Sequence, residues 1–126
     1  MSAPRISLQM IFTAAWNAFI VGDAKPARNN FSCSYLTSDG RKCAVGLVLP
    51  DGHLAQSRVC PFYELTLEYQ DLWDDQIRSM AEYRLNMFQR RLHDDLSNSQ
   101  GWILDKPTIE KKYRQVAKEF ELTVPE

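Results

Sequence analysis

Residues 33–50 read Cys33-Ser-Tyr-Leu-Thr-Ser-Asp-Gly-Arg-Lys-Cys-Ala-Val-Gly-Leu-Val-Leu-Pro50, the densest run of residues with special backbone or chemical demands in the chain. The Asp-Gly pair within it is typical of a tight turn between two antiparallel strands. The apolar run that follows, 41–49, fits either the second strand of such a hairpin or a short helix with Cys43 in its first turn. Both alternatives stay open, because an apolar run this short has no decisive periodicity. The expected element is a small hairpin or turn-helix unit at 31–49.

The segment before this unit has the pattern of an amphipathic helix. Apolar residues recur at helical spacing from 6 to 21. Ser7 is a candidate N-cap for this helix, and Gly22 is a candidate C-terminal stop.

Two further helices are expected after the unit. The first begins at Asp71 or Asp74 and runs to about Leu92, with one apolar stripe. The second has Pro107 in its first turn, where the missing N–H costs nothing. Its apolar positions have the clearest helical spacing in the chain: Ile109, Tyr113, Val116, Ala117 and Phe120. The expected fold is a single domain over 1–126, α+β in class but mainly helical, with three principal helices around the unit at 31–49.

Composition places the chain among ordinary globular proteins. Of its 126 residues, 44% are hydrophobic and 25% are charged, and the formal net charge is −1. No signal peptide and no apolar run of membrane-spanning length are present, so we expect a cytoplasmic protein that does not bind membranes. Three cysteines, an odd number, favour free thiols over a disulfide framework.

One segment carries charge of a single sign. No Lys or Arg occurs from 59 to 77, where acidic residues alternate with aromatic ones. Such a surface suits docking on a basic partner. The alternative is a solvated face whose acids lie near a helix start. The candidate binding residues are Glu64, Glu68, Tyr69, Asp71, Trp73, Asp74 and Asp75.

A thiol site is the main candidate for catalysis. Cys43 follows two basic residues, which would favour its thiolate, and His93 with Asp94 could supply a base and an orienting acid. Asp94 adjoins His93 in the sequence, however, and a neighbour orients an imidazole poorly. The alternative for Cys43 is a packed structural thiol.

Metal, cofactor and nucleic-acid sites have less support. Cys33, Cys43 and His93 could ligate zinc, but the paired spacings of a structural zinc site are missing. No P-loop, GxGxxG or HExxH pattern occurs, so no cofactor is expected. Basic residues near 84–91 lie opposite an apolar stripe, as a solvated helix face does, so direct binding of nucleic acid is not expected.

Several motifs occur in a recognisable order: Cys33-Ser-Tyr35, Gly40, Lys42-Cys-Ala-Val-Gly46, Leu49-Pro-Asp51, His93-Asp94, Trp102 and Val116-Ala-Lys-Glu-Phe120. This order resembles a family of small proteins of uncharacterised function from phage genomes and bacterial prophage regions. The resemblance implies a phage-associated accessory protein and does not itself imply a reaction.

The predicted function is therefore that of a non-enzymatic phage accessory protein. It would bind and inhibit a host protein, for example a defence component, through the acidic, aromatic-rich segment. One alternative is a Cys/His-dependent hydrolase that uses Cys43 and His93. The other is a protein that sequesters a small ligand such as a nucleotide, using Arg41, Lys42 and the backbone at Gly46.

Overall fold

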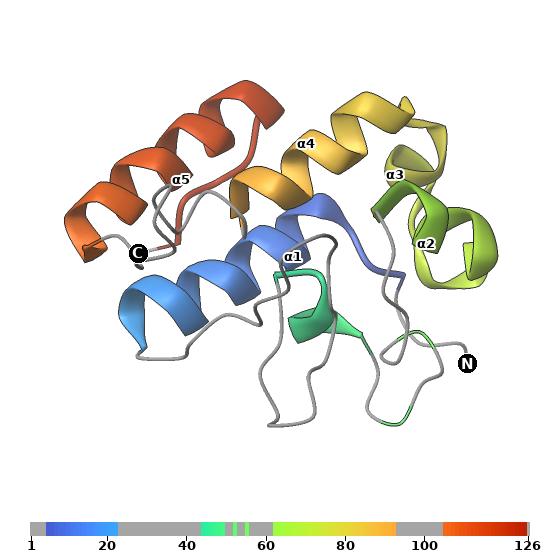
Figure 1. The fold of residues 1–126 in the computed structure, drawn as a ribbon, viewed down its shortest axis with the longest axis horizontal. Helices are drawn as coiled ribbons and strands as arrows, with labels where there is room; N and C mark the ends of the chain where they lie inside the picture. Colours follow the sequence, from blue (N-terminus) through green and yellow to red (C-terminus); the bar gives the residue numbers. More distant parts are fainter. Residues whose placement is uncertain are drawn as a thin grey trace, which may run out of the picture.

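The computed structural model describes residues 5–22, 44–49, 52, 55, 62–92 and 105–125, which form helices joined by turns (Figure 1). The α-helices are α1 (Leu8–Ala15), α2 (Phe62–Glu68), α3 (Asp75–Ser79), α4 (Glu82–Leu92) and α5 (Lys106–Phe120). Shorter segments accompany them: the π-helical η1 (Trp16–Val21) and the 3-10 helices η2 (Gly46–Val48) and η4 (Gln70–Leu72).

The backbones of Ile6 and Trp73 pair in an isolated parallel β-bridge. The Ile6 N–H donates to the Leu72 carbonyl at 2.7 Å, and the Asp74 N–H donates to the Ile6 carbonyl at 2.9 Å. No strand occurs within the described ranges. The mainly helical prediction is confirmed there, and the described residues do not support the α+β label. Residues 31–43, which carry the other half of the expected hairpin, lie outside the described ranges.

The segment 44–49 is a turn followed by η2, so the helical alternative holds for this part of the unit. The Val48 N–H donates to the Val45 carbonyl at 3.1 Å, and the Leu49 N–H donates to the Gly46 carbonyl at 3.4 Å. These bonds satisfy the backbone locally, and η2 packs against α1. Ala44, Val45 and Leu49 are buried in this turn, and Leu47 and Val48 are half-buried against the core.

The first helix begins and ends where the sequence predicts. The Ser7 hydroxyl accepts a hydrogen bond from the Met10 N–H at 3.1 Å, as an N-cap does. At the other end, the Gly22 N–H donates to the Asn17 carbonyl at 2.9 Å and closes η1. The change from α-helix to π-helix at Trp16 was not predicted.

Gly22 is the site of a stability prediction. A Cβ atom there would lie 3.0 Å from the Asn17 carbonyl oxygen and 3.1 Å from the Ala18 carbonyl oxygen, both of which are backbone atoms. Gly22→Ala should therefore lower the free energy of unfolding by about 1–2 kcal/mol, as overpacking does. Urea unfolding measures this change, with Asn17→Ala at an exposed position of the same segment as control. Equal stability of the two variants would contradict the prediction.

The predicted helix ending at Leu92 is in fact two helices. Asp74 caps the start of α3, because its carboxylate accepts from the Ile77 N–H at 2.9 Å. Met80 then adopts an extended backbone with ψ of 146°, and α4 begins at Glu82. A single unbroken helix from Asp75 to Leu92 would have one axis direction throughout. The break lets α3 pack against α2 while α4 packs against both α2 and α5.

The last helix follows its predicted pattern most closely. Pro107 lies in its first turn, and every one of its predicted apolar positions is buried. The helix ends at Glu121, whose φ of 57° is left-handed. The chain then folds back and is held by Gln9, whose side-chain amide accepts from the Thr123 N–H at 2.8 Å and donates to the Thr123 carbonyl at 2.9 Å.

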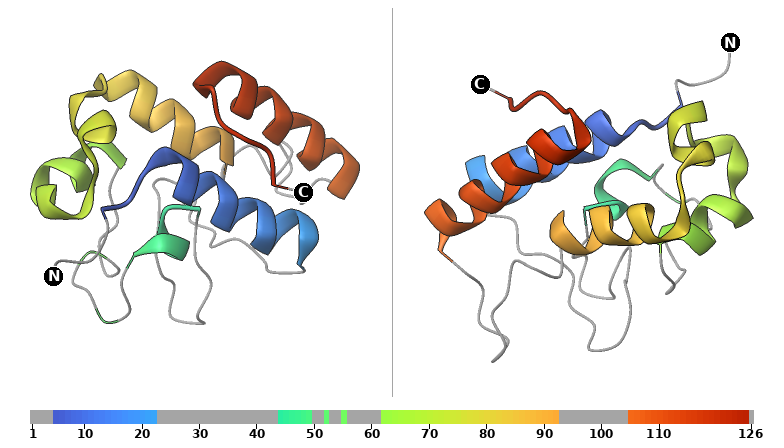
Figure 2. Two further views of the ribbon diagram at one scale, coloured as in Figure 1. Left: turned by 180° about the vertical axis from the view of Figure 1, so that it is seen from behind. Right: turned by 90° about the horizontal axis from the view of Figure 1, so that it is seen from above.

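Figures 1 and 2 show α1, α4 and α5 packed together, with α2 and α3 at the end of the molecule far from the start of α5. The core between α1 and α5 is aromatic. The Tyr113 ring centre lies 5.8 Å from that of Phe12 and 6.5 Å from that of Trp16. This packing leaves one side of α2, η4 and α3 facing solvent.

Candidate functional site

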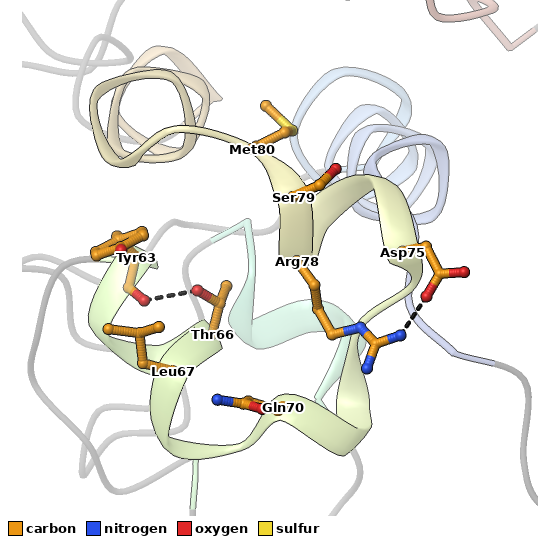
Figure 3. A pocket seen from close by; sticks show the side chains of 8 residues that line it. All are labelled: Tyr63, Thr66, Leu67, Gln70, Asp75, Arg78, Ser79 and Met80. Atoms are coloured by element: carbon orange, nitrogen blue, oxygen red, sulfur yellow. Dashed lines mark hydrogen bonds and ion pairs between the residues drawn. The ribbon is translucent and has the colours of Figure 1, made fainter.

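The solvent-facing side of α2, η4 and α3 is hollowed. One hollow of about 370 Å³ lies between α2 and α3 and is lined by Tyr63, Leu67, Gln70 and Arg78 among others (Figure 3). A neighbouring hollow of about 320 Å³ shares Leu67 and Gln70 and extends to Tyr69 and Asp71. The two hollows therefore share part of their lining, which comes from α2, η4 and α3.

Acidic side chains lie on the same three elements as the hollows. Four of the predicted binding residues are exposed: Glu64 and Glu68 on α2, Asp71 on η4 and Asp75 on α3. Tyr69 is half-buried and lines the second hollow. We call the exposed face of α2, η4 and α3, with these residues and both hollows, the acidic end. Four of the seven predicted binding residues thus line the hollows, namely Glu68, Tyr69, Asp71 and Asp75, whereas Glu64 is exposed on α2 and lines neither.

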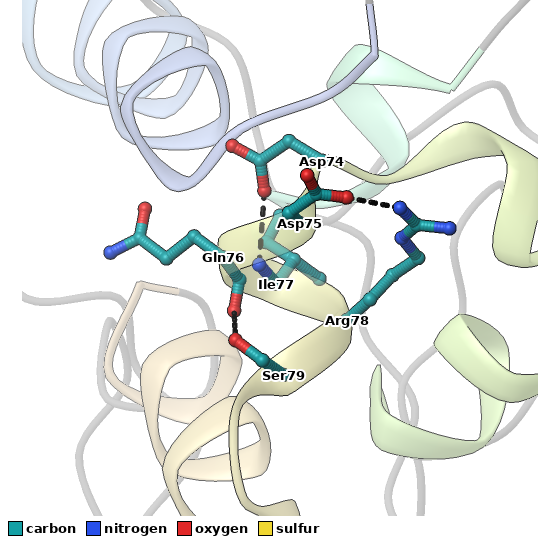
Figure 4. Close-up of polar contacts among 6 residues, drawn as sticks. All are labelled: Asp74, Asp75, Gln76, Ile77, Arg78 and Ser79. Carbon is teal, nitrogen blue, oxygen red and sulfur yellow. Dashed lines mark hydrogen bonds and ion pairs between the residues drawn. The ribbon is translucent and has the colours of Figure 1, made fainter.

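Asp74 has a structural role instead. It is half-buried, and its carboxylate holds the Ile77 N–H at the start of α3, as Figure 4 shows. A carboxylate used as an N-cap stabilises its helix, so a substitution here would change the fold as well as the surface charge.

Trp73 lies in the core, which corrects the expectation that its ring belongs to the binding surface. Its side chain is fully buried and packs edge-on against Phe62, with ring centres 5.3 Å apart. The indole Nε1 is buried and has no hydrogen-bond partner among the described residues. The backbone of Trp73 pairs with that of Ile6 in the parallel bridge, and this pairing holds the ring on the inner side of η4.

Leu67 is an apolar residue of the acidic end that sequence reasoning missed. Its side chain is 52% exposed and contributes to both hollows. The buried face of α2 consists of Phe62, Leu65 and Thr66, so Leu67 points away from the core. A helix over 62–68 would have predicted this orientation, but the charge pattern of the segment indicates only an acidic run.

Arg78 is the second missed residue, and it places a positive charge in the first hollow. Its guanidinium forms an ion pair with the Asp75 carboxylate, drawn in Figures 3 and 4. The Arg78 side chain is 36% exposed, whereas that of Asp75 is 91% exposed. The pair therefore leaves most of the Asp75 carboxylate in contact with solvent.

The predicted catalytic and metal residues cannot be placed in this way. Cys33, Cys43, His93 and Asp94 lie outside the described residues, so the thiol site and the zinc site stay predictions. Among the residues that are described, no three His, Cys, Asp or Glu side chains are grouped to hold a metal ion. In the same part of the chain, none of the helices combines the length and apolar character that a membrane span requires.

Comparisons of the chain with models of protein families, with characterised proteins and with solved structures found no match. The resemblance to phage and prophage proteins accordingly stays a prediction from the motifs in the sequence.

Proposed function

We propose that this protein acts by binding, and that its acidic end docks on a basic surface of another protein. The observation that carries the proposal is the position of Leu67, an exposed apolar side chain within a hollowed surface bordered by carboxylates. An apolar centre with a charged rim is the usual anatomy of a protein interface. Carboxylates on the rim select a basic partner and accelerate the encounter.

The charge pattern supports a partner with a strongly basic surface. From 62 to 77 the chain has five acidic side chains and no basic one. The phage resemblance gives this surface a context, since an accessory protein of a phage acts on the proteins of its host. The partner proposed is a host protein, such as a defence component, whose basic surface is built to bind nucleic acid. Occupying that surface would inhibit the host protein without any chemical step.

Neutralising the exposed acids should weaken capture of the partner. In the triple variant Glu64→Gln, Glu68→Gln and Asp71→Asn, each lost rim charge is expected to cost a few tenths to one kcal/mol. The sum of about 1–3 kcal/mol corresponds to a roughly five- to 150-fold loss of affinity. The measurement is a pull-down with the tagged protein from a bacterial host lysate at about 0.1 M and 1 M salt, because screening shortens the Debye length from about 10 Å to about 3 Å.

A matched triple variant on α5 and the residue after it provides the control. Glu110→Gln, Glu119→Gln and Glu121→Gln change the net charge by the same amount, at positions outside the acidic end. The proposal expects a partner that the control variant retains, the acidic-end variant loses and high salt releases. A partner held equally by both variants would show that docking occurs elsewhere.

A further inference from the structure

The hollow between α2 and α3 already holds a guanidinium group, that of Arg78. Figure 3 shows this side chain running beside α3 to Asp75, with Gln70 and Leu67 on the other side of the hollow. The Asp75–Arg78 ion pair joins residues three positions apart on one short helix. Such exposed pairs are weak, because water competes for both partners. A second guanidinium from outside can therefore replace Arg78 at little cost.

Two hydroxyl groups of the hollow are placed to accept hydrogen bonds. The Thr66 hydroxyl donates its proton to the Tyr63 carbonyl at 2.6 Å, and the Ser79 hydroxyl donates its proton to the Gln76 carbonyl at 3.1 Å. Each hydroxyl oxygen keeps lone pairs but has no proton left to donate. Together with the Asp75 carboxylate, these oxygens can accept hydrogen bonds from a ligand that is rich in donors. Guanidinium has five N–H donors and no acceptor.

The apolar part of the hollow fits the remainder of an arginine side chain. Leu67 is exposed, and Tyr63 and Met80 are half-buried on either side of the same hollow. The three methylene groups of arginine cover apolar surface while the charged group stays near water. A planar guanidinium also stacks on an aromatic ring, which an ammonium group does less well.

We propose that this hollow is a pocket for an arginine side chain of the partner, and that Arg78 occupies it in the free protein as an internal competitor. The inference rests on the proposed function and specifies which basic residue the acidic end selects. The partner's arginine takes the Asp75 carboxylate from Arg78, which turns outward into solvent. Competition from Arg78 thereby lowers the affinity of the hollow for weakly basic surfaces. A partner surface that presents a well-placed arginine can still displace Arg78 and bind.

The test uses two peptides of equal charge. Acetylated and amidated hexaarginine and hexalysine are titrated separately into the ¹⁵N-labelled full chain, and amide shifts are followed by NMR. Hexaarginine is expected to shift the amides of Leu67, Gln70 and Ser79 and to bind at least about fivefold more tightly than hexalysine, since only guanidinium combines stacking with paired hydrogen bonds. Equal affinities, or shifts that avoid these three residues, would overturn the inference.

The variant Arg78→Ala tests whether Arg78 competes with the peptide for the hollow, apart from the general effect of removing one positive charge. This variant should bind hexaarginine about two- to fivefold more tightly than the unmodified protein, which is the range expected from releasing one exposed ion pair. Arg90→Ala removes the same charge from an exposed position on α4 and should leave the affinity nearly unchanged. Equal effects of the two variants, or weaker binding by Arg78→Ala, would overturn the competitor role.

The outcomes also distinguish this inference from the function on which it rests. If hexaarginine and hexalysine bind the acidic end equally, the arginine pocket is wrong and docking on a basic surface still holds. If neither peptide shifts the three amides, the pocket is wrong, and the pull-down with the matched triple variants decides the proposed function separately.

Discussion

Tyr113→Ala should lower the free energy of unfolding by about 3–5 kcal/mol, the range for removing a large buried aromatic side chain. Tyr113 is fully buried, and its ring contacts Phe12 and Trp16 across the interface of α5 with α1 and η1. Its hydroxyl donates to the Leu92 carbonyl at the end of α4. One side chain of α5 thus contacts three other elements, α1, η1 and α4. Because domains are stable by only about 5–15 kcal/mol, this loss is a large share of the total.

A second substitution separates the contribution of the Tyr113 ring to stability from that of its hydroxyl group. Tyr113→Phe keeps the ring but leaves the Leu92 carbonyl without this donor, which should cost about 1–2 kcal/mol. Urea unfolding with circular dichroism detection measures both variants. Gln115→Ala, at an exposed position on the same helix, is the control and should change stability by less than about 0.5 kcal/mol. A Tyr113→Ala variant as stable as this control would refute the packing of α5 on α1.

Trp73→Ala should be similarly damaging, with a loss of about 3–5 kcal/mol, because the indole is fully buried and packs edge-on against Phe62 in the core. Trp73→Phe should cost much less, about 1–2 kcal/mol. It removes part of the ring, but it also removes the buried Nε1 donor, which has no partner among the described residues and is itself unfavourable. The two unfolding midpoints measured under the same conditions test this difference.

The Trp73 variants also separate a core role from a binding role. Trp73→Phe should remain folded and retain the captured partner, unlike the acidic-end triple variant. Loss of capture by Trp73→Phe at an unchanged unfolding midpoint would mean that the ring contacts the partner directly. That result would contradict the assignment of Trp73 to the core.

The acidic end shows how one sequence pattern can contain exposed residues together with residues that have structural roles. The one-signed run from 59 to 77 is visible without a structure, and four of its carboxylates are exposed. The same run also contains Asp74, which caps a helix, and Trp73, which fills the core. Charge and aromatic content alone cannot separate these roles, because both depend on which side of the chain faces the neighbouring elements.

What the sequence by itself determined were features that arise between residues a few positions apart. The apolar spacing of α5 predicted its buried face. Local backbone effects account for the N-cap at Ser7, the stop at Gly22 and the first helical turn at Pro107. Each depends on hydrogen bonds or steric contacts within about one turn of helix.

Only the tertiary structure decided the break at Met80, the compact turn at 44–49 and the burial of Trp73. The break at Met80 places α3 against α2 and α4 against α5, although the local sequence does not interrupt a helix. Trp73 is buried because its backbone pairs with Ile6, a residue 67 positions earlier in the chain. Periodicity shows that a segment has an apolar side, but the partner that covers it comes from elsewhere in the chain, and packing against that partner outweighs local preference.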